Sequence, residues 1–386
     1  MNNRLSGSLS LALIPFLVTR FLIIVVFVFV SALSFDEPVQ EFGLRIQEPI
    51  ISLNQSGLAQ NIRTRILNAD AAWYVGIAAH GYERLPFEAT REHNWAFFPL
   101  WPLVLGYFGK ITSEYGFTGA ILANVFFFFA LILLHQLVLE FGFLQEDAQR
   151  TLIYLAVYPT SYFFALPFTE SLFLLLIVGC FLAAKKDVWW LSGVLGGLAA
   201  STRVTGLCLF PAIALLYWQR YRSINIKALT LLLIPAGIVP YMIFLHRITG
   251  NALAFLDVQK AWGHSLGLFL YPLWEYIRSP LDINFRWDFR LLNFLAALLA
   301  FSCGIVLLKR KQWALATYTL LCVLLPLSAM RLQSLTRYTM VAFPIFMLLA
   351  EAGRSTRIDQ IIRTVFLFLL GLMTLLFALH FSMAMS

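Results

Sequence analysis

The segment from Asn68 to Tyr82 brings one carboxylate into a run of aromatic side chains. Asp70 lies near its start, and the aromatic and imidazole members are Trp73, Tyr74, His80 and Tyr82. Trp and Tyr at roughly helical spacing are typical of an amphipathic helix that lies in the membrane interface. At the start of such a helix, Asp70 is either a cap that the helix dipole favours or a general base that takes a proton from a hydroxyl at the membrane surface.

A second acid follows two helix-breaking prolines. Pro159 and Pro167 interrupt an apolar stretch and free backbone carbonyls, which are tolerated only where they face protein or a water-filled cavity. Thr169 and Glu170 come directly afterwards, and in one interpretation they are the cap and a first-turn acid of the next helix. In the other interpretation Glu170 belongs to a polar site, because acids beside broken helices mark functional sites in membranes.

Three arginines, Arg203, Arg331 and Arg337, lie at the ends of apolar stretches without balancing acids close by in the sequence. A guanidinium group can extend to the interface with no partner, or it can bind a phosphate through its planar fork. The lack of nearby acids favours an anionic ligand. Trp262 and His264 add two more rings on what we predict to be the same side. With Glu170 and the rings of the first segment, these side chains form the candidate substrate-binding set.

Other kinds of site are not indicated. The four cysteines are scattered through apolar runs without a CxxC pair, so they do not predict a zinc site. The chain has no Walker motif, no GxGxxG, no HExxH and no nucleophile elbow. We predict no metal ligands and no certain cofactor, and the residues give no support for a divalent cation. Any group that the protein transfers should therefore come from a membrane lipid rather than from a soluble nucleotide.

The composition requires a bilayer around these residues. Of 386 residues, 60% are hydrophobic and 12% are charged, against about 25% charged in ordinary soluble domains. Mean hydropathy is +0.79. A soluble enzyme is excluded, because no globular surface could cover so much apolar area. The net charge of +8 falls in short clusters between apolar runs, so it marks membrane topology rather than a nucleic-acid partner.

The pattern predicts an all-α polytopic protein, one integral membrane domain over residues 1–386. About eleven spans are expected, near 9–34, 118–140, 151–166, 170–184, 188–201, 204–218, 228–246, 291–308, 313–330, 338–352 and 364–384. Placing the tight basic clusters in the cytoplasm puts the N-terminus inside and every candidate site residue outside. Two long outer loops result, 35–96 and 247–290, and the first carries Asp70 and short interfacial helices. The stretch 97–111 is expected either to cross or to lie against the membrane, and eleven crossings require the second.

Several segments resemble one family in its own order. They are Asp70-Ala-Ala-Trp73-Tyr74-x-x-Ile77-Ala78-x-x-Gly81-Tyr82, Phe97-Phe-Pro99-Leu-Trp-Pro102, Thr169-Glu170-Ser171-Leu172-Phe173, Arg203-Val-Thr-Gly206, Leu253-Ala254-Phe255-x-x-x-Gln259-x-x-Trp262-Gly263 and Arg337-Tyr338-x-x-x-x-Phe343-Pro344. Together they are similar to the second GPI mannosyltransferase (PIG-V type) family and its prokaryotic relatives, in the GT-C superfamily of glycosyltransferases. The resemblance covers residues of about 70–350 and is specific for the family, not for the sugar.

The resemblance implies a polyprenyl-phosphate sugar donor, with mannose the expected sugar, used on the outer or lumenal face. It implies that Asp70 is the catalytic acid of the first outer loop. The neighbours of Asp70 are Ala69 and Ala71, so the paired acids of some superfamily members are missing, which argues against a metal here. Membrane lipids and an unidentified acceptor glycan or lipid are the remaining expected partners. The expected location is a bacterial inner membrane, or the ER membrane if the protein is eukaryotic.

These residues permit direct displacement at the anomeric carbon with inversion. Asp70 would take the proton of the acceptor hydroxyl, and Arg203 with Arg331 or Arg337 would stabilise the leaving phosphate. A transporter or flippase of lipid-linked sugars is the alternative, because it could use the same arginines and broken helices. Such a protein needs gates on both faces, whereas the polar features of this sequence cluster on one.

Overall fold

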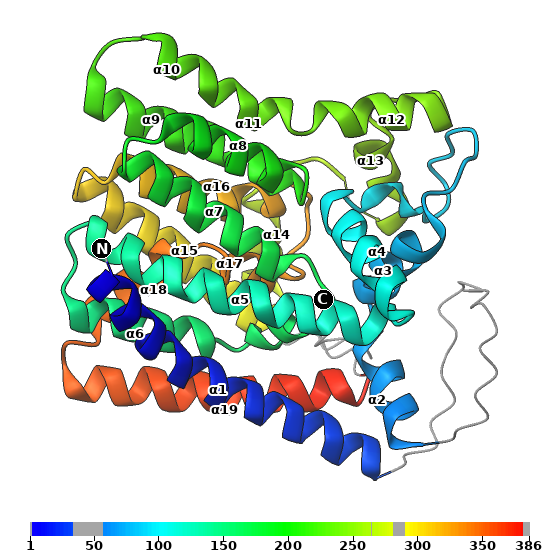
Figure 1. Ribbon diagram of the computed structural model, residues 1–386, viewed down its shortest axis with the longest axis horizontal. Coiled ribbons are helices and arrows are strands. Elements are labelled where there is room, and N and C mark those ends of the chain that lie inside the picture. The colour runs from blue at the N-terminus through cyan, green and yellow to red at the C-terminus, as the bar shows by residue number, and fades with distance from the viewer. Residues whose placement is uncertain (1, 34–56, 264, 281–289, 381–386) are drawn as a thin grey trace.

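The computed structural model describes residues 2–33, 57–263, 265–280 and 290–380. Every regular element in those ranges is a helix, and no strand occurs among them. Figure 1 shows the long helices lying roughly side by side, with a group of short helices gathered at one end. The prediction of an all-α polytopic membrane protein is confirmed.

Five helical stretches are long and apolar enough to cross a bilayer. They are α1 (Asn2–Ala32), α5 (Tyr115–Glu140), the broken stretch Ile226–Thr249, α15 (Arg290–Lys309) and α19 (Thr356–Ala378). The broken stretch consists of α10 (Ile226–Leu229), η4 (Thr230–Leu232), α11 (Leu233–Ala236) and α12 (Val239–Thr249). Each of the five coincides with a span that the sequence predicts.

The remaining predicted spans overlap shorter helices, but two have wrong bounds: the α-helix that overlaps 151–166 ends at Ala156, and the one within 338–352 begins at Pro344. The shorter helices are α6 (Gln145–Ala156), α7 (Glu170–Lys185), α8 (Trp189–Ala200), α9 (Leu209–Tyr221), α16 (Trp313–Leu327) and α18 (Pro344–Ala352). Most of α7 is buried, as expected for a helix that its neighbours surround on all sides. The number of crossings, eleven, stays a prediction.

The short helices at one end of Figure 1 include α2 (Leu58–Ile66), α3 (Asp70–His80), α4 (Leu100–Thr112) and α13 (Ala254–Asp257). Helix α4 packs closely on α3, because a Cβ added at Gly106 would lie 3.1 Å from the carbonyl oxygen of Ala78. It also contacts α5. That helix α4 stays on one side of the membrane remains a prediction.

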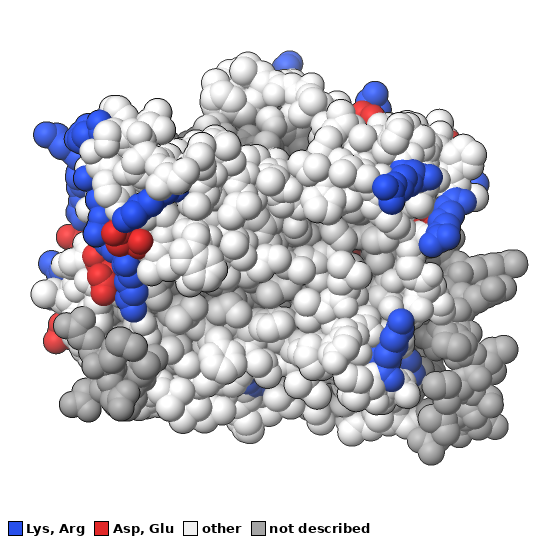
Figure 2. Space-filling view, turned by 45° about the horizontal axis from the view of Figure 1, so that its top comes forward, with Lys and Arg blue, Asp and Glu red and all other residues white. Residues whose placement is uncertain are grey.

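The basic clusters meet at the opposite end, as the sequence predicts. Ion pairs join parts of the chain that are distant in sequence there, including Lys227 with Asp187, Arg310 with Glu351, and Arg354 with Asp147. Figure 2 shows charged side chains concentrated at the two ends of this face, with a broad, nearly uncharged band between them. This distribution fits a bilayer that surrounds the middle of the protein.

Helices α8 and α11–α12 touch through their backbones. A Cβ added at Gly197 would lie 2.5 Å from the carbonyl oxygen of Leu233, and one added at Gly237 would lie 2.0 Å from that of Gly197. Glycine is required at both positions, since small residues let membrane helices approach closely. One turn after Gly237, Tyr241 donates hydrogen bonds to the carbonyl oxygens of Trp95, at 2.8 Å, and Phe97, at 3.1 Å. The close contact thus positions a helix that holds the loop between α3 and α4.

The predicted orientation can be tested with impermeant thiol reagents on intact cells or sealed vesicles. The four native cysteines are buried, so the background should be low. We expect Thr90→Cys, on the loop after α3, to react from outside, and Ser223→Cys, between α9 and α10, to react only after permeabilisation. Both side chains are exposed. If Ser223→Cys alone is labelled from outside, the protein has the opposite orientation.

Candidate active site

Four charged side chains converge where several helices begin. Asp70 and Glu170 are the first residues of α3 and α7, Arg203 precedes η3 (Val204–Cys208), and Arg337 lies in α17 (Leu335–Thr339). Each lies at the start of a helix or in a short helical turn. Such positions place side chains at the end of the bundle. Buried Asn293 of α15 fixes α17, since its Oδ1 accepts hydrogen bonds from the backbone N–H, at 2.9 Å, and the hydroxyl, at 2.8 Å, of Thr336.

The four groups form one chain of ion pairs. Arg337 donates from Nη1 to Oδ2 of Asp70 at 2.6 Å and from Nε to Oε1 of Glu170 at 2.5 Å. Arg203 donates from Nη1 to the same Glu170 oxygen and, at 3.0 Å, to Oγ1 of Thr169. The side chains of Glu170 and Arg337 are 1% and 6% exposed, whereas that of Asp70 is 37% exposed. Asp70 is therefore the carboxylate of this set that a substrate can reach.

Two expectations from the sequence are wrong in detail. Arg203 and Arg337 do have balancing acids, because residues far apart in the chain meet here. The capping expectation for α3 is wrong, since Ala69 occupies the cap position and Asp70 the first turn. For α7, Thr169 is the cap residue and Glu170 a first-turn acid, as expected, but neither helix has a side-chain cap hydrogen bond. The carboxylates of Asp70 and Glu170 face arginines instead.

Aromatic rings enclose the two arginines, which the sequence did not indicate. The guanidinium carbon of Arg337 lies 4.6 Å and 4.8 Å from the ring centres of Phe163 and Phe168. That of Arg203 lies 5.3 Å from the ring centre of Tyr338. Such contacts stabilise a cation that is withdrawn from water. The phenylalanines flank Pro167, so the broken segment itself supplies the walls of the site.

Tyr74, one turn after Asp70, is buried beside the charged groups. Burial raises the pKa of its phenol, and the nearby Arg203 and Arg337 only partly offset this. Tyr74 therefore stays neutral at physiological pH and is suited to hydrogen bonding rather than to proton abstraction. Its ring meets that of Phe97 edge to face at 5.1 Å.

Three rings form a half-buried cluster next to Asp70. Trp73 stacks on Phe97 at 5.4 Å between ring centres, and Trp262 meets both edge to face at about 6 Å. Arg331 lies against the same loop, because a Cβ added at Gly263 would lie 2.3 Å from its Nη2. Arg331 is exposed and makes no described ion pair. The structure therefore brings Trp73, Trp262 and Arg331 into one region, as the sequence suggested.

Two other candidates, His80 and Tyr82, are not brought to the charged groups. His80 ends α3, ten residues from Asp70 and about 15 Å away along the helix axis. Tyr82 donates a hydrogen bond to the carbonyl oxygen of Phe97 at 2.7 Å and packs against Tyr241, so its contacts are structural. His264 lies outside the described residues.

Positive charge at this site comes from arginine side chains. Among the described residues, no group of three or more His, Cys, Asp or Glu side chains could hold a metal ion. Arg203 and Arg337 present planar guanidinium groups that can hold an anion. The accessible carboxylate of Asp70 beside them can take up a proton.

The comparisons with known proteins agree with this geometry. The sequence model of the mannosyltransferase (PIG-V) family matches residues 11–245, more than half of the chain. Asp70, Glu170 and Arg203 lie within the matched stretch, whereas Arg337 lies beyond it. No curated protein and no solved structure matches the chain. The chain is an integral membrane glycosyltransferase that belongs to the PIG-V mannosyltransferase family.

Proposed function

We propose that the protein transfers mannose from a polyprenyl-phosphate donor to a hydroxyl of an acceptor at the outer or lumenal membrane face. The observation that supports this most directly is the pairing of an accessible carboxylate, Asp70, with the buried Arg337. A transferase of this kind needs a base for the acceptor and a cation for the lipid phosphate, and this arrangement offers both within one contact.

In the proposed step, Asp70 accepts the proton of the acceptor hydroxyl while the hydroxyl oxygen of the acceptor attacks the anomeric carbon. The bond between that carbon and the phosphate oxygen breaks, and the polyprenyl phosphate leaves with the bonding pair. Displacement from the opposite face inverts the anomeric configuration. Arg203 and Arg337 stabilise the charge that develops on the phosphate.

Glu170 has a positioning role in this proposal. Its Oε1 accepts hydrogen bonds from both arginines, so it fixes their planes relative to Asp70. The donor phosphate then competes with the carboxylates for guanidinium N–H groups, and Asp70, the more exposed acid, is the one that gives way. Its departure from Arg337 would free it to act as the base.

The clustering of these groups at one end favours a transferase over a transporter of lipid-linked sugars. At the other end, the ion pairs join helix ends to the segments between helices, as in Lys227–Asp187 and Arg354–Asp147. A transporter needs a site that opens alternately to both faces.

We propose the bacterial inner membrane as the location, or the ER membrane in a eukaryote.

The test is transfer by the purified protein. We expect protein incubated with radiolabelled polyprenyl-phosphate mannose and a membrane lipid extract to form one labelled product with an α linkage, if the donor is the β anomer. Nucleotide-linked mannose in place of the lipid donor should give none. Transfer from the nucleotide sugar, or transport of intact lipid-linked sugar without transfer, would contradict the proposal.

A further inference from the structure

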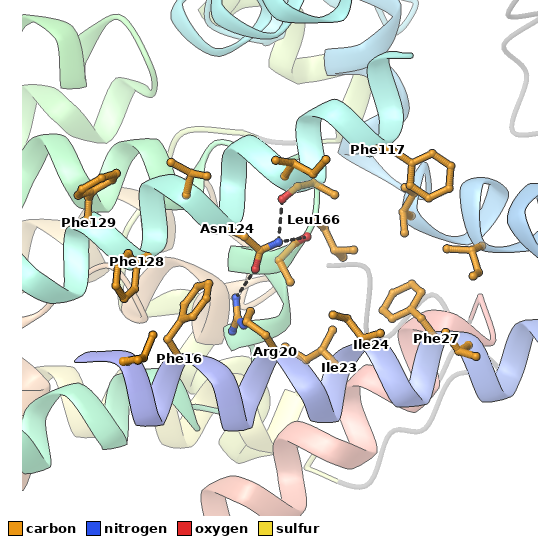
Figure 3. A pocket seen from close by; sticks show the side chains of 18 residues that line it. Phe16, Arg20, Ile23, Ile24, Phe27, Phe117, Asn124, Phe128, Phe129 and Leu166 are labelled. Carbon is orange, nitrogen blue, oxygen red and sulfur yellow. Dashed lines mark hydrogen bonds between the residues drawn. The ribbon is translucent and has the colours of Figure 1, made fainter. Parts of the chain in front are cut away.

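A groove of about 650 Å³ opens between α1 and α5, and none of the four charged site residues lines it. This volume is in the usual range for small-molecule sites. Figure 3 shows side chains from both helices converging on it, with Phe27 and Phe117 toward one end and Phe128 and Phe129 toward the other. From Phe117 to Phe129, α5 advances about 18 Å, at 1.5 Å per residue. The groove is therefore elongated, and its shape suits a chain.

One cation lies in this apolar groove. Arg20 lines it and is 5% exposed. Its hydrogen bonds are long, 3.4 Å each, and they reach Oδ1 of Asn124 and the carbonyl and hydroxyl oxygens of Ser161. Its Nε has no hydrogen-bond partner among the described residues, and none of their carboxylates pairs with it. Ionisable residues inside membranes are costly, so a retained one suggests a function.

Arg20 also contacts two aromatic rings. Its guanidinium carbon lies 4.8 Å from the ring centre of Phe127 and 5.8 Å from that of Phe16. The other polar lining side chain, Asn124, already donates to the carbonyl oxygens of Ala120 and Ala165. A phosphate needs several hydrogen-bond donors, whereas this groove offers one cation among apolar side chains.

Depth also argues against a charged occupant. The apolar part of α1 runs from Gly7 to Ala32, and Arg20 lies at its middle. Either end is about 18–20 Å away along the helix. An anionic headgroup would have to leave the interface to reach Arg20, whereas the hydrocarbon chain of a lipid lies at this depth already.

The groove leads toward the charged site. Ile66 lines it, four residues before Asp70, and Leu166 lines it, four residues before Glu170. Between them, the segment that accepts hydrogen bonds from Arg20 at Ser161 also supplies Phe163 and Phe168 to Arg337. A lipid whose phosphate meets Arg337 could therefore extend its chain along α1 and α5.

We propose that this groove binds the isoprenoid chain of the carrier lipid, and that Arg20 selects an unsaturated chain by cation–π contact with its double bonds. The inference rests on the proposed function for the identity of the lipid. A saturated chain would fill the same space but would offer Arg20 no π-electrons. The arginine would thus favour isoprenoid carriers, which have a double bond in each unsaturated unit, over saturated acyl chains.

The test uses two probes that share a phosphate, a length and a branching pattern: a polyprenyl phosphate and its fully hydrogenated counterpart. Purified protein is mixed with equal amounts of both, and native mass spectrometry resolves the two adducts by mass. We expect the unsaturated lipid to be preferred by about 2- to 30-fold, the range that a cation–π contact allows. Arg20→Met, similar in length and apolar, should bind both lipids equally.

Two α1 variants test the location. Ile24 lines the groove and Val18 does not, although both are exposed, β-branched and apolar. Ile24→Trp should lower both adducts together, on the order of tenfold, and Val18→Trp should leave them unchanged. If Arg20→Met does not fold, Arg20→Lys replaces it, and a retained cation should preserve part of the preference.

Equal adducts in the natural protein, an unchanged preference in Arg20→Met, or identical behaviour of the two tryptophan variants would overturn the inference. None of these outcomes depends on mannose, because both probes lack a sugar. Failure of mannose transfer would overturn the proposed function, whereas the lipid preference is decided separately by the two sugar-free probes.

Discussion

Asp70→Asn should reduce mannose transfer by roughly 10²- to 10⁴-fold, the usual contribution of general acid–base catalysis. The substitution keeps the size of the side chain and an oxygen that can accept the hydrogen bond from Arg337. The amide cannot take up the proton of the acceptor hydroxyl. Folding and binding of the lipid donor should therefore change little while turnover falls, as measured by single-turnover assays alongside donor binding.

The matched control is Glu88→Gln, which removes a carboxylate from the exposed loop that follows α3. It should leave transfer within about twofold of the natural protein, because surface changes away from special features have small effects. If Asp70 serves only as the counter-ion of Arg337, Asp70→Asn should retain near-normal transfer. That result would remove the catalytic assignment and leave Glu170 as the next carboxylate to test.

Glu170→Ala should destabilise the protein by about 3–5 kcal/mol, the cost of removing one partner from a buried ion pair. The side chain of Glu170 is 1% exposed and compensates both Arg203 and Arg337. Its loss leaves two enclosed guanidinium groups and a single carboxylate, that of the partly exposed Asp70, to compensate them. Thermal unfolding in detergent should show the effect as a large decrease in Tm.

Glu170→Gln separates charge from hydrogen bonding, since its amide oxygen can still accept from an arginine. We expect an intermediate Tm for it, and Glu88→Ala should have almost none of the effect. A second substitution, Arg203→Met added to Glu170→Ala, should recover part of the stability by removing one uncompensated cation. Equal Tm values for Glu170→Ala and the natural protein would show that the pair contributes nothing.

The helices could largely be predicted because their signals are local. The predicted span 170–184 ends just before Lys185, and the span 188–201 begins just after Asp187, because charge interrupts the apolar pattern there. Helices α7 and α8 have nearly the same bounds. The broken segment around Pro159 and Pro167 was likewise visible in the sequence. Basic clusters identified a common end of the bundle because Lys and Arg are enriched in the short loops on one side of the membrane.

The contacts of the site could not be predicted, because they join distant parts of the chain. Asp70 and Arg337 are 267 positions apart, and Glu170 and Arg203 are 33 apart. Nothing in their local sequence indicates that they pair, so the arginines looked uncompensated. Arg20 was visible as the one charge in the first span, but its position between α1 and α5 depends on Asn124 and Ser161, which the sequence does not single out.

The direct backbone contact between α8 and α11–α12 means that two glycines outside the charged groups help to position the aromatic rings of the site. Gly197 and Gly237 meet with no room for a methyl group, and the helix that carries Gly237 continues to Tyr241 and the carbonyl oxygens of Trp95 and Phe97. Phe97 is the ring on which Trp73 stacks. A methyl group added at either glycine would push the two helices apart, and through Tyr241 the displacement would reach the aromatic rings beside Asp70.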